Sequence, residues 1–365
     1  MILHAYFARK FLLNFLALFA IMFGLVFVID VIDQTRKFSS FDISFREVLG
    51  LTILNIPESL NEVLPLIIIF STVSLFVGLA RSSELVVTRA SGRSAMRAVI
   101  APAVMAFLIG CIAVMMLGPL VAATSKRYAV VAENYRSGGA SALAVSVDGL
   151  WLRQGDETGQ AVIRATRSNT DASVLFDVSF YMFDPEGSPI RRIEAENARL
   201  TQDGWQLDMA KSWPLERGQN PEVNAETFES LTVSTTLTLD RIRENLGRPS
   251  FVSIWDMRDY IDQLEVSGFS SRAHRVWLIS EFARPLFLMS MVLVAAAFTM
   301  RHTRFGGTGI AVLAAVLLGF SLYFIRSFAH ILGENGQLPI LLAAWAPPMA
   351  ALFLATGLLL SAEDG

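Results

Sequence analysis

Long apolar segments dominate the two ends of the chain. Six of them reach the roughly 20 residues that an α-helix needs to cross the hydrocarbon core of a bilayer. They occupy residues 11–32, 56–79, 98–120, 276–300, 308–332 and 338–360. The first is longer than the roughly 7 to 15 apolar residues of a signal-peptide core and lacks a small-residue cleavage pattern, so it is interpreted as a retained span. The pattern predicts six transmembrane helices, three on each side of a polar middle stretch.

The middle stretch has the pattern of an all-β domain. Strands are predicted at residues 144–153, 160–166, 173–183, 189–200, 204–211 and 228–237. In the third of them, alternation predicts one face made of Val174, Phe176, Val178, Phe180 and Met182. Turn-forming residues separate the strands, which favours an antiparallel sandwich or jelly-roll. Helical spacing then predicts a short helix at 254–266 that returns the chain to the membrane surface.

Composition and charge fit this architecture and orient it. The chain is 53% hydrophobic with a mean hydropathy of +0.49, which excludes an ordinary soluble domain. Basic residues gather beside short span ends that share one side: Arg9, Lys10, Arg81, Arg89, Arg93, Arg97, Arg301 and Arg304. Because Lys and Arg concentrate in cytoplasmic loops, both termini are predicted to be cytoplasmic and the middle domain to lie across the membrane. We expect domains at 1–123, 124–268 and 269–365.

The middle domain is acidic. Residues 124–265 contain 22 Asp and Glu against 15 Lys and Arg. A nucleic-acid-binding protein would carry its basic residues on such a polar domain, so this function class is excluded.

The loop between the second and third spans, residues 81–97, is polar but patterned (RSSELVVTRASGRSAMR). Ser82 and Ser83 favour a helix N-terminus, Glu84 suits a first turn, and Gly92 suits a helix end. A helix of about two turns would present apolar side chains such as Leu85 to water, and it therefore needs a groove to lie in. The alternative is an ordinary basic loop held at the cytoplasmic face by the positive-inside effect.

Motifs of catalysis are missing from the sequence. There is no G-x-x-x-x-G-K-[ST] phosphate loop, no His pair with metal-ligand spacing and no G-x-S-x-G nucleophile elbow. The four histidines are scattered over the termini and span ends. The single cysteine, Cys111, lies in an apolar run and forms neither a disulfide framework nor a cysteine metal site. We expect no enzyme activity, no metal and no cofactor.

Ionisable residues lie within or at the rim of the spans, where an unpaired charge costs at least about 2.5 to 3.5 kcal/mol. They are Asp30, Glu58, Glu62, Glu281, Arg284 and Arg326. Glu281 and Arg284 are three residues apart, so they either neutralise each other or contact a ligand. Arg326 either snorkels to the interface or faces an interior cavity.

Arg36 and Lys37 follow the first span on the non-cytoplasmic side, against the positive-inside trend. An anionic ligand at that leaflet would explain them, and so would ordinary scatter of surface charge.

Three stretches resemble the lipopolysaccharide-export permease family, LptF/LptG, and its LptG branch most. They are VIDVIDQ at 28–34, RSSELVV through ASG at 81–92, and NYR at 134–136 followed by GLWLR at 149–153. The second stretch is the most specific, and the resemblance covers essentially the whole chain.

The resemblance implies a permease that pairs with an LptF-type sister subunit above a dimeric LptB-type ATPase. It implies that residues 82–94 form a coupling helix, in which Glu84 matches an acid that meets a basic residue of the ATPase. The other coupling residues expected in this helix are Leu85, Val86, Arg89 and Gly92. The middle domain is then a periplasmic β-jellyroll that passes lipopolysaccharide toward LptC and LptA, and the first and fifth spans gate the lipid cavity. The location implied is the bacterial inner membrane.

The resemblance also implies lipid contacts. Arg36 and Lys37 match basic residues near the lipid A phosphates, and Arg136 matches one at the junction of membrane and jellyroll. Arg284 and Arg326 are added to the lipid-binding set on physical grounds alone. Asp30 departs from the family, since some LptG proteins carry a Lys near this position.

Two functions follow as hypotheses. The first is a transporter subunit that moves an amphiphile and is powered by a separate ATPase. The second is a membrane-anchored periplasmic scaffold or binding protein, whose spans only hold the β-domain in place.

Overall fold

The computed structural model describes residues 2–41, 43–85, 87, 95–137, 142–146, 149–156, 159–169, 173–201, 204–215, 220–235, 248–266, 269–300 and 308–364. They divide into two compact units: Met1–Ser125 with Arg275–Gly365, and Lys126–His274. The second unit is inserted in the sequence between the two parts of the first. The domain boundaries expected at 123/124 and 268/269 stay predictions.

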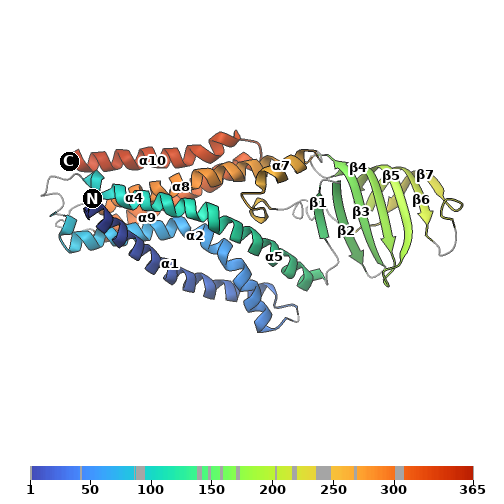
Figure 1. Cartoon of the computed structure of the whole chain (residues 1–365), viewed down its shortest axis with the longest axis horizontal. Helices are drawn as coiled ribbons and strands as arrows, with labels where there is room; N and C mark the ends of the chain where they lie inside the picture. Colours follow the sequence, from blue (N-terminus) through green and yellow to red (C-terminus); the bar gives the residue numbers. More distant parts are fainter. Residues whose placement is uncertain are drawn as a thin grey trace. The chain divides into compact units, whose positions relative to one another are not determined.

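Long helices account for nearly all of the first unit (Figure 1). The long helices of the chain are α1 (Ile2–Lys37), α2 (Phe45–Arg81), α4 (Ala95–Ile112), α5 (Gly118–Ser137), α8 (Arg272–Thr299), α9 (Thr308–Glu334) and α10 (Ile340–Asp364). A π-helical turn, Ala113–Leu117, joins α4 to α5. Among the described residues, six helical segments are long and apolar enough to cross a membrane, with α4 and α5 contributing to one of them. The six spans predicted from the apolar runs are confirmed.

Local sequence fixes where α2 begins and ends. At its start the backbone N–H of Ser44 donates to the Glu47 carboxylate over 2.6 Å, which satisfies a donor that the helix itself leaves free. At its end the N–H of Ser82 donates to the carbonyl of Gly78 over 3.0 Å. With 37 residues at 1.5 Å each, α2 is about 55 Å long and exceeds the roughly 30 Å hydrocarbon core.

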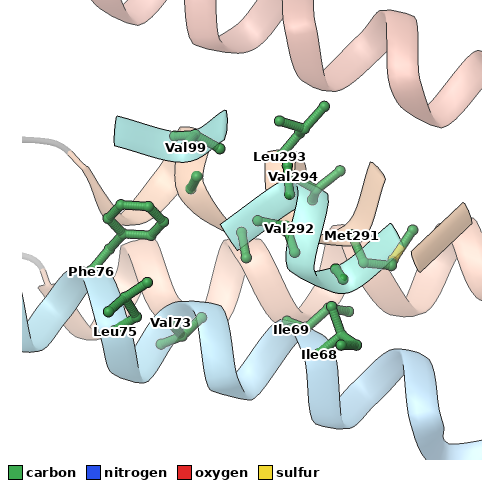
Figure 2. Close-up of a cluster of buried hydrophobic side chains, with 14 of the residues drawn as sticks. Ile68, Ile69, Val73, Leu75, Phe76, Val99, Met291, Val292, Leu293 and Val294 are labelled. Atoms are coloured by element: carbon green, nitrogen blue, oxygen red, sulfur yellow. The ribbon is translucent and has the colours of Figure 1, made fainter. Parts of the chain in front are cut away.

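The core of the first unit consists of aliphatic and aromatic side chains from several helices. Figure 2 shows Ile68, Ile69, Val73, Leu75 and Phe76 of α2 near Val99 of α4 and residues 291–294 of α8. Close approach of α4 and α8 requires a glycine, because a Cβ on Gly110 would lie 2.6 Å from Cα of Pro285. The helix α8 is the most enclosed span, which is consistent with its central role in this packing.

The second unit contains a single antiparallel sheet within its described residues (Figure 1). Its strands are β1 (Ala142–Ser146), β2 (Gly149–Asp156), β3 (Gly159–Ser168), β4 (Val174–Phe183), β5 (Pro189–Thr201), β6 (Gly204–Pro214) and β7 (Glu226–Val233). They pair in sequence order from β1 to β7. The inserted all-β domain is confirmed, and its described connectivity is that of a meander rather than of two stacked sheets.

One face of the sheet is buried in a core around Trp205 and Phe180, which meet edge to face at 6.4 Å. Leu264 of the short helix α7 (Met257–Val266) belongs to the same core. The predicted helix at 254–266 is therefore present, although it begins at Met257. Its apolar face covers part of the sheet within this unit.

Two details of the predicted strands are wrong. The segment 144–153 is not one strand but parts of β1 and β2, which pair with Ser146 opposite Gly149. The sequence Asp148-Gly149, a turn-favouring dipeptide, marks the interruption.

The uniform alternation predicted for 173–183 also fails. Val178 and Phe180 are buried as expected, but Leu175 is buried in place of Phe176. Asp177 between them has a φ of 52°, and this left-handed residue changes which side chains face the core.

Candidate functional site

The loop after α2 carries the acid that the sequence singled out. Of the two serines predicted to begin the next helix, Ser82 instead ends α2, and Ser83 directly precedes the new turn. Ser83 adopts a φ of 57°, and its carbonyl accepts from the N–H of Val87 over 3.1 Å. A helical turn therefore starts at Glu84. Val86, Arg89 and Gly92 lie outside the described residues, so the extent of the coupling helix at 82–94 stays a prediction.

The Glu84 carboxylate contacts the beginning of α1. The Lys10 ammonium donates to both carboxylate oxygens, at 2.8 and 3.0 Å. The Tyr6 hydroxyl donates to Oε2 over 2.8 Å, and the Ser82 hydroxyl donates to Oε1 over 2.9 Å. These contacts, led by the Lys10 hydrogen bond, lower the pKa of Glu84 and keep it ionised near neutral pH.

In the sequence, Lys10 indicates only which end of the first span is cytoplasmic, and no pattern assigns a function to Tyr6. A signal was available, because residues 6 and 10 are four apart and share one face of a helix. Nothing in the sequence, however, shows which distant residue that face meets.

Two apolar neighbours of Glu84 have opposite environments. Leu85 is 5% exposed and belongs to the hydrophobic core of the helical unit. Val87 is 68% exposed. The loop is thus anchored on one side by Leu85, while Val87 is exposed and the Glu84 side chain is 34% exposed.

The far end of α1 carries the predicted lipid-binding cations. Lys37 forms an ion pair with Asp33 over 2.7 Å, one helical turn away. Arg36 is exposed, and no carboxylate of the described residues lies within ion-pair distance of its guanidinium. The helix α5 includes Arg136, but its side chain lies outside the described residues. Of these three cations, Arg36 is the one that the described chain leaves available to an anion.

Asp30 is turned toward α2. It is 6% exposed, and its carboxylate accepts a hydrogen bond from the Asn55 amide over 2.6 Å and from the Gln34 amide over 3.5 Å. This carboxylate therefore joins α1 to α2. The residue that departs from the family pattern serves helix packing in this chain.

A buried polar cluster lies between α2 and α8. One guanidinium nitrogen of Arg284 donates to both oxygens of Glu281, at 3.0 and 2.8 Å. The other terminal nitrogen donates to the carbonyl of Asn61 over 2.7 Å. Of the two alternatives from the sequence, mutual neutralisation of Glu281 and Arg284 is what the geometry shows.

Arg326 of α9 has a different environment. Its guanidinium lies 5.2 Å from the centroid of the Phe287 ring. Within the described part of the chain no carboxylate reaches it at ion-pair distance. A cation held against an aromatic ring in an apolar span retains the capacity to bind an anion.

No cluster suited to a metal ion accompanies these sites. Within the described residues, no group of three or more His, Cys, Asp or Glu side chains could hold one.

Comparison with known proteins agrees with this architecture. The family model described as lipopolysaccharide export system permease LptF/LptG matches residues 5–361. The LptG permease protein of Haemophilus influenzae is 23% identical over 347 residues, which cover 93% of both chains. The LptG permease protein of Escherichia coli K12 is 24% identical over 350 residues, which cover 91% of both chains. With the match extending over all six spans and the inserted sheet, the chain belongs to the LptF/LptG family of lipopolysaccharide export permeases.

Proposed function

We propose that this chain is the permease subunit that extracts lipopolysaccharide from the bacterial inner membrane and passes it to a periplasmic bridge, powered by a separate ATPase. The observation that carries the proposal is the family match over residues 5–361. The two relatives described above, each matched over at least 91% of its own length, are both named as LptG permease proteins. The partners proposed are an LptB-type ATPase dimer, an LptF-type sister permease, and LptC-type and LptA-type bridge proteins.

The loop at Glu84 is the proposed contact with the ATPase. Leu85 fixes the loop to the helical core, so a force on the loop acts on a packed structure rather than on a free tether. The exposed Val87 would supply an apolar contact, and the partly exposed Glu84 side chain would supply an anionic one. An anionic side chain at the tip of a docked helix selects a basic partner residue. The undescribed Val86, Arg89 and Gly92 would complete this coupling helix.

The orientation follows from this assignment. An ATPase works in the cytoplasm, so the Glu84 loop and both termini would face it. The inserted sheet would then lie in the periplasm, as the distribution of Lys and Arg predicts.

Lipopolysaccharide would be bound by cations of the outer half of the spans. Arg36 would contact its phosphates directly, and Lys37 and Arg136 are also proposed to bind it. Arg326 would bind an anionic group inside the cavity, and Arg284 would shape that region through its contacts with Glu281 and Asn61.

The test is purification of the complex with substitutions at Glu84. Glu84→Lys is expected to remove the ATPase from the purified permease and to abolish ATP-driven lipopolysaccharide release. Arg81→Glu, three residues away on the exposed end of α2, is the control for a change of charge in the same loop. Retention of the ATPase and of release by Glu84→Lys would remove Glu84 from the coupling mechanism.

A further inference from the structure

The carboxylate proposed to meet the ATPase is already bound within the chain. Its two oxygens accept from three side chains of the described chain: Lys10 donates twice, and Tyr6 and Ser82 donate once each. An ionised carboxylate offers about four lone-pair sites, so most of its hydrogen-bonding capacity is used by these side chains. Two of the three partners belong to α1, which is more than 70 residues away in sequence.

The donors are themselves held in place. The Lys10 ammonium lies 4.8 Å from the centroid of the Tyr6 ring, a cation–π distance. Between and beside them, Phe7 and Phe11 are 1% and 0% exposed and share a hydrophobic core with Leu85. The beginning of α1 and the Glu84 turn are therefore joined by polar contacts and by common packing.

The helix α1 connects this contact to the lipid-binding end of the chain. It has 36 residues, which at 1.5 Å each give about 54 Å of uninterrupted helix. Tyr6 and Lys10 lie near its start, and Arg36 lies at its end. A helix is stiff along its axis, so a displacement at the start is transmitted to the end without an intermediate element.

We propose that Tyr6 and Lys10 are positioning residues of the coupling site, which hold Glu84 for the ATPase and transfer the movement of the loop to α1. This proposal rests on the proposed function, in which Glu84 contacts the ATPase. The same side chain serves both contacts: Lys10 and Tyr6 approach it from α1, and the 34% of it that is exposed is the part proposed to meet the partner.

The experiment uses the purified complex reconstituted in proteoliposomes with lipopolysaccharide, and it measures release per ATP hydrolysed. Lys10→Met combined with Tyr6→Phe removes the donors and keeps the apolar volume. We expect release per ATP to fall about tenfold, with ATP hydrolysis changed less than twofold. Lys10→Arg retains a cationic donor and is expected to restore at least half of the release.

Arg9→Met is the matched control. Arg9 is the neighbouring cation on α1, is exposed, and has no contact with Glu84 among the described residues. Normal release per ATP in the Lys10→Met, Tyr6→Phe double variant would overturn the proposal. Loss of the ATPase from the double variant but not from Arg9→Met would support it, because Glu84 would then be misplaced for docking. Equal loss from both would overturn it.

A second measurement tests the contact in the chain alone. Lys10→Glu and Glu84→Lys each place like charges together and should lower the melting temperature of the detergent-solubilised chain. The double substitution restores an ion pair and should recover most of that loss, whereas no recovery would overturn the contact. If no ATPase co-purified with the wild-type chain, the proposed function would be refuted. The double substitution Lys10→Glu, Glu84→Lys would still test the contact between residues 10 and 84.

Discussion

At the scale of single residues, two adjacent cations at the end of α1 differ in what already binds them. Lys37 is paired with Asp33 over 2.7 Å, whereas Arg36 has no such carboxylate among the described residues. A lipid phosphate that approaches Lys37 must compete with Asp33, and one that approaches Arg36 meets a free bidentate donor. The neighbouring positions therefore have unequal affinities for an anion.

We expect Arg36→Glu to reduce the recovery of lipopolysaccharide with the purified protein about five- to tenfold, and Lys37→Glu less than threefold. The measurement is quantification of co-purified lipid at low and at 0.5 M salt, since exposed charges are screened at high salt. Lys37→Glu is the internal control for charge reversal at this end of the helix. Equal losses for the two variants would show that Asp33 does not distinguish them.

The ionisation of Glu84 makes the stability of the folded chain depend on pH, with lower stability at acid pH. Its pKa lies below the ordinary value of 4.5 because Lys10, Tyr6 and Ser82 donate to the ionised carboxylate. A lowered pKa in the folded state means that the contact stabilises the protein above pH 4.5 and loses this effect as the pH falls through the lowered value. For a partly exposed pair the effect is small, on the order of 0.5 kcal/mol.

We therefore expect the melting temperature of the wild-type chain to exceed that of Glu84→Gln by about 1 °C at pH 6. The difference should shrink as the pH falls through the lowered pKa of Glu84 and disappear below it, where the wild-type carboxyl is also neutral. Thermal unfolding of both proteins across this pH range measures it. A difference that grows toward acid pH would contradict the contacts described for Glu84.

At the scale of elements, the spans could be predicted and their contacts could not. A helix needs about 20 apolar residues to cross a bilayer, so each span can be recognised in one continuous segment of the sequence. The Glu84 site joins residues 6, 10, 82 and 84, and only tertiary packing brings these together. The same limit applies to Asp30, whose partner Asn55 belongs to another helix.

The strands show a local form of this limit. Period-two alternation predicted β4 well from Val178 onward, but it could not reveal that Asp177 adopts a positive φ. Met209 in β6 also adopts a positive φ. There the next buried position after Leu207 is Ala210, three residues later instead of two. The change is set by the whole sheet, because neighbouring strands must keep their buried side chains on one face.

Packing of α4 against α8 provides a prediction at this scale. A methyl group on Gly110 would meet the backbone of Pro285 at 2.6 Å, and a proline backbone inside a helix has little freedom to move away. We expect Gly110→Ala to destabilise the protein by about 1 to 3 kcal/mol through overpacking. Gly24→Ala in α1 is the matched control, since a methyl group there would have no neighbouring atom within 4 Å and alanine favours helix. Melting temperatures in detergent distinguish them, and a Gly110→Ala protein as stable as Gly24→Ala would refute the close approach.

At the scale of the whole molecule, the two proposed functions differ in what they require of the helical unit. A scaffold needs one span to hold the sheet in place. The transport proposed above uses the path from the Glu84 turn through α1 to Arg36, which lies in the unit formed by Met1–Ser125 and Arg275–Gly365. The polar contacts of Arg284 within the spans are also costly to maintain, and a simple anchor has no use for them.

Transplanting the inserted unit separates these functions. Residues 126–274 joined to one unrelated span would keep the sheet and its Trp205 core but lose every helix that contacts Glu84. We expect cells depleted of the full chain to stop exporting lipopolysaccharide when they produce only this fusion, and to resume export with the full chain. Protease resistance of the sheet and the blue-shifted tryptophan emission expected from the buried Trp205 establish that the fusion is folded. Export supported by a folded fusion would favour the scaffold, because a protein without α1 and the Glu84 turn has no route by which an ATPase could move the lipid.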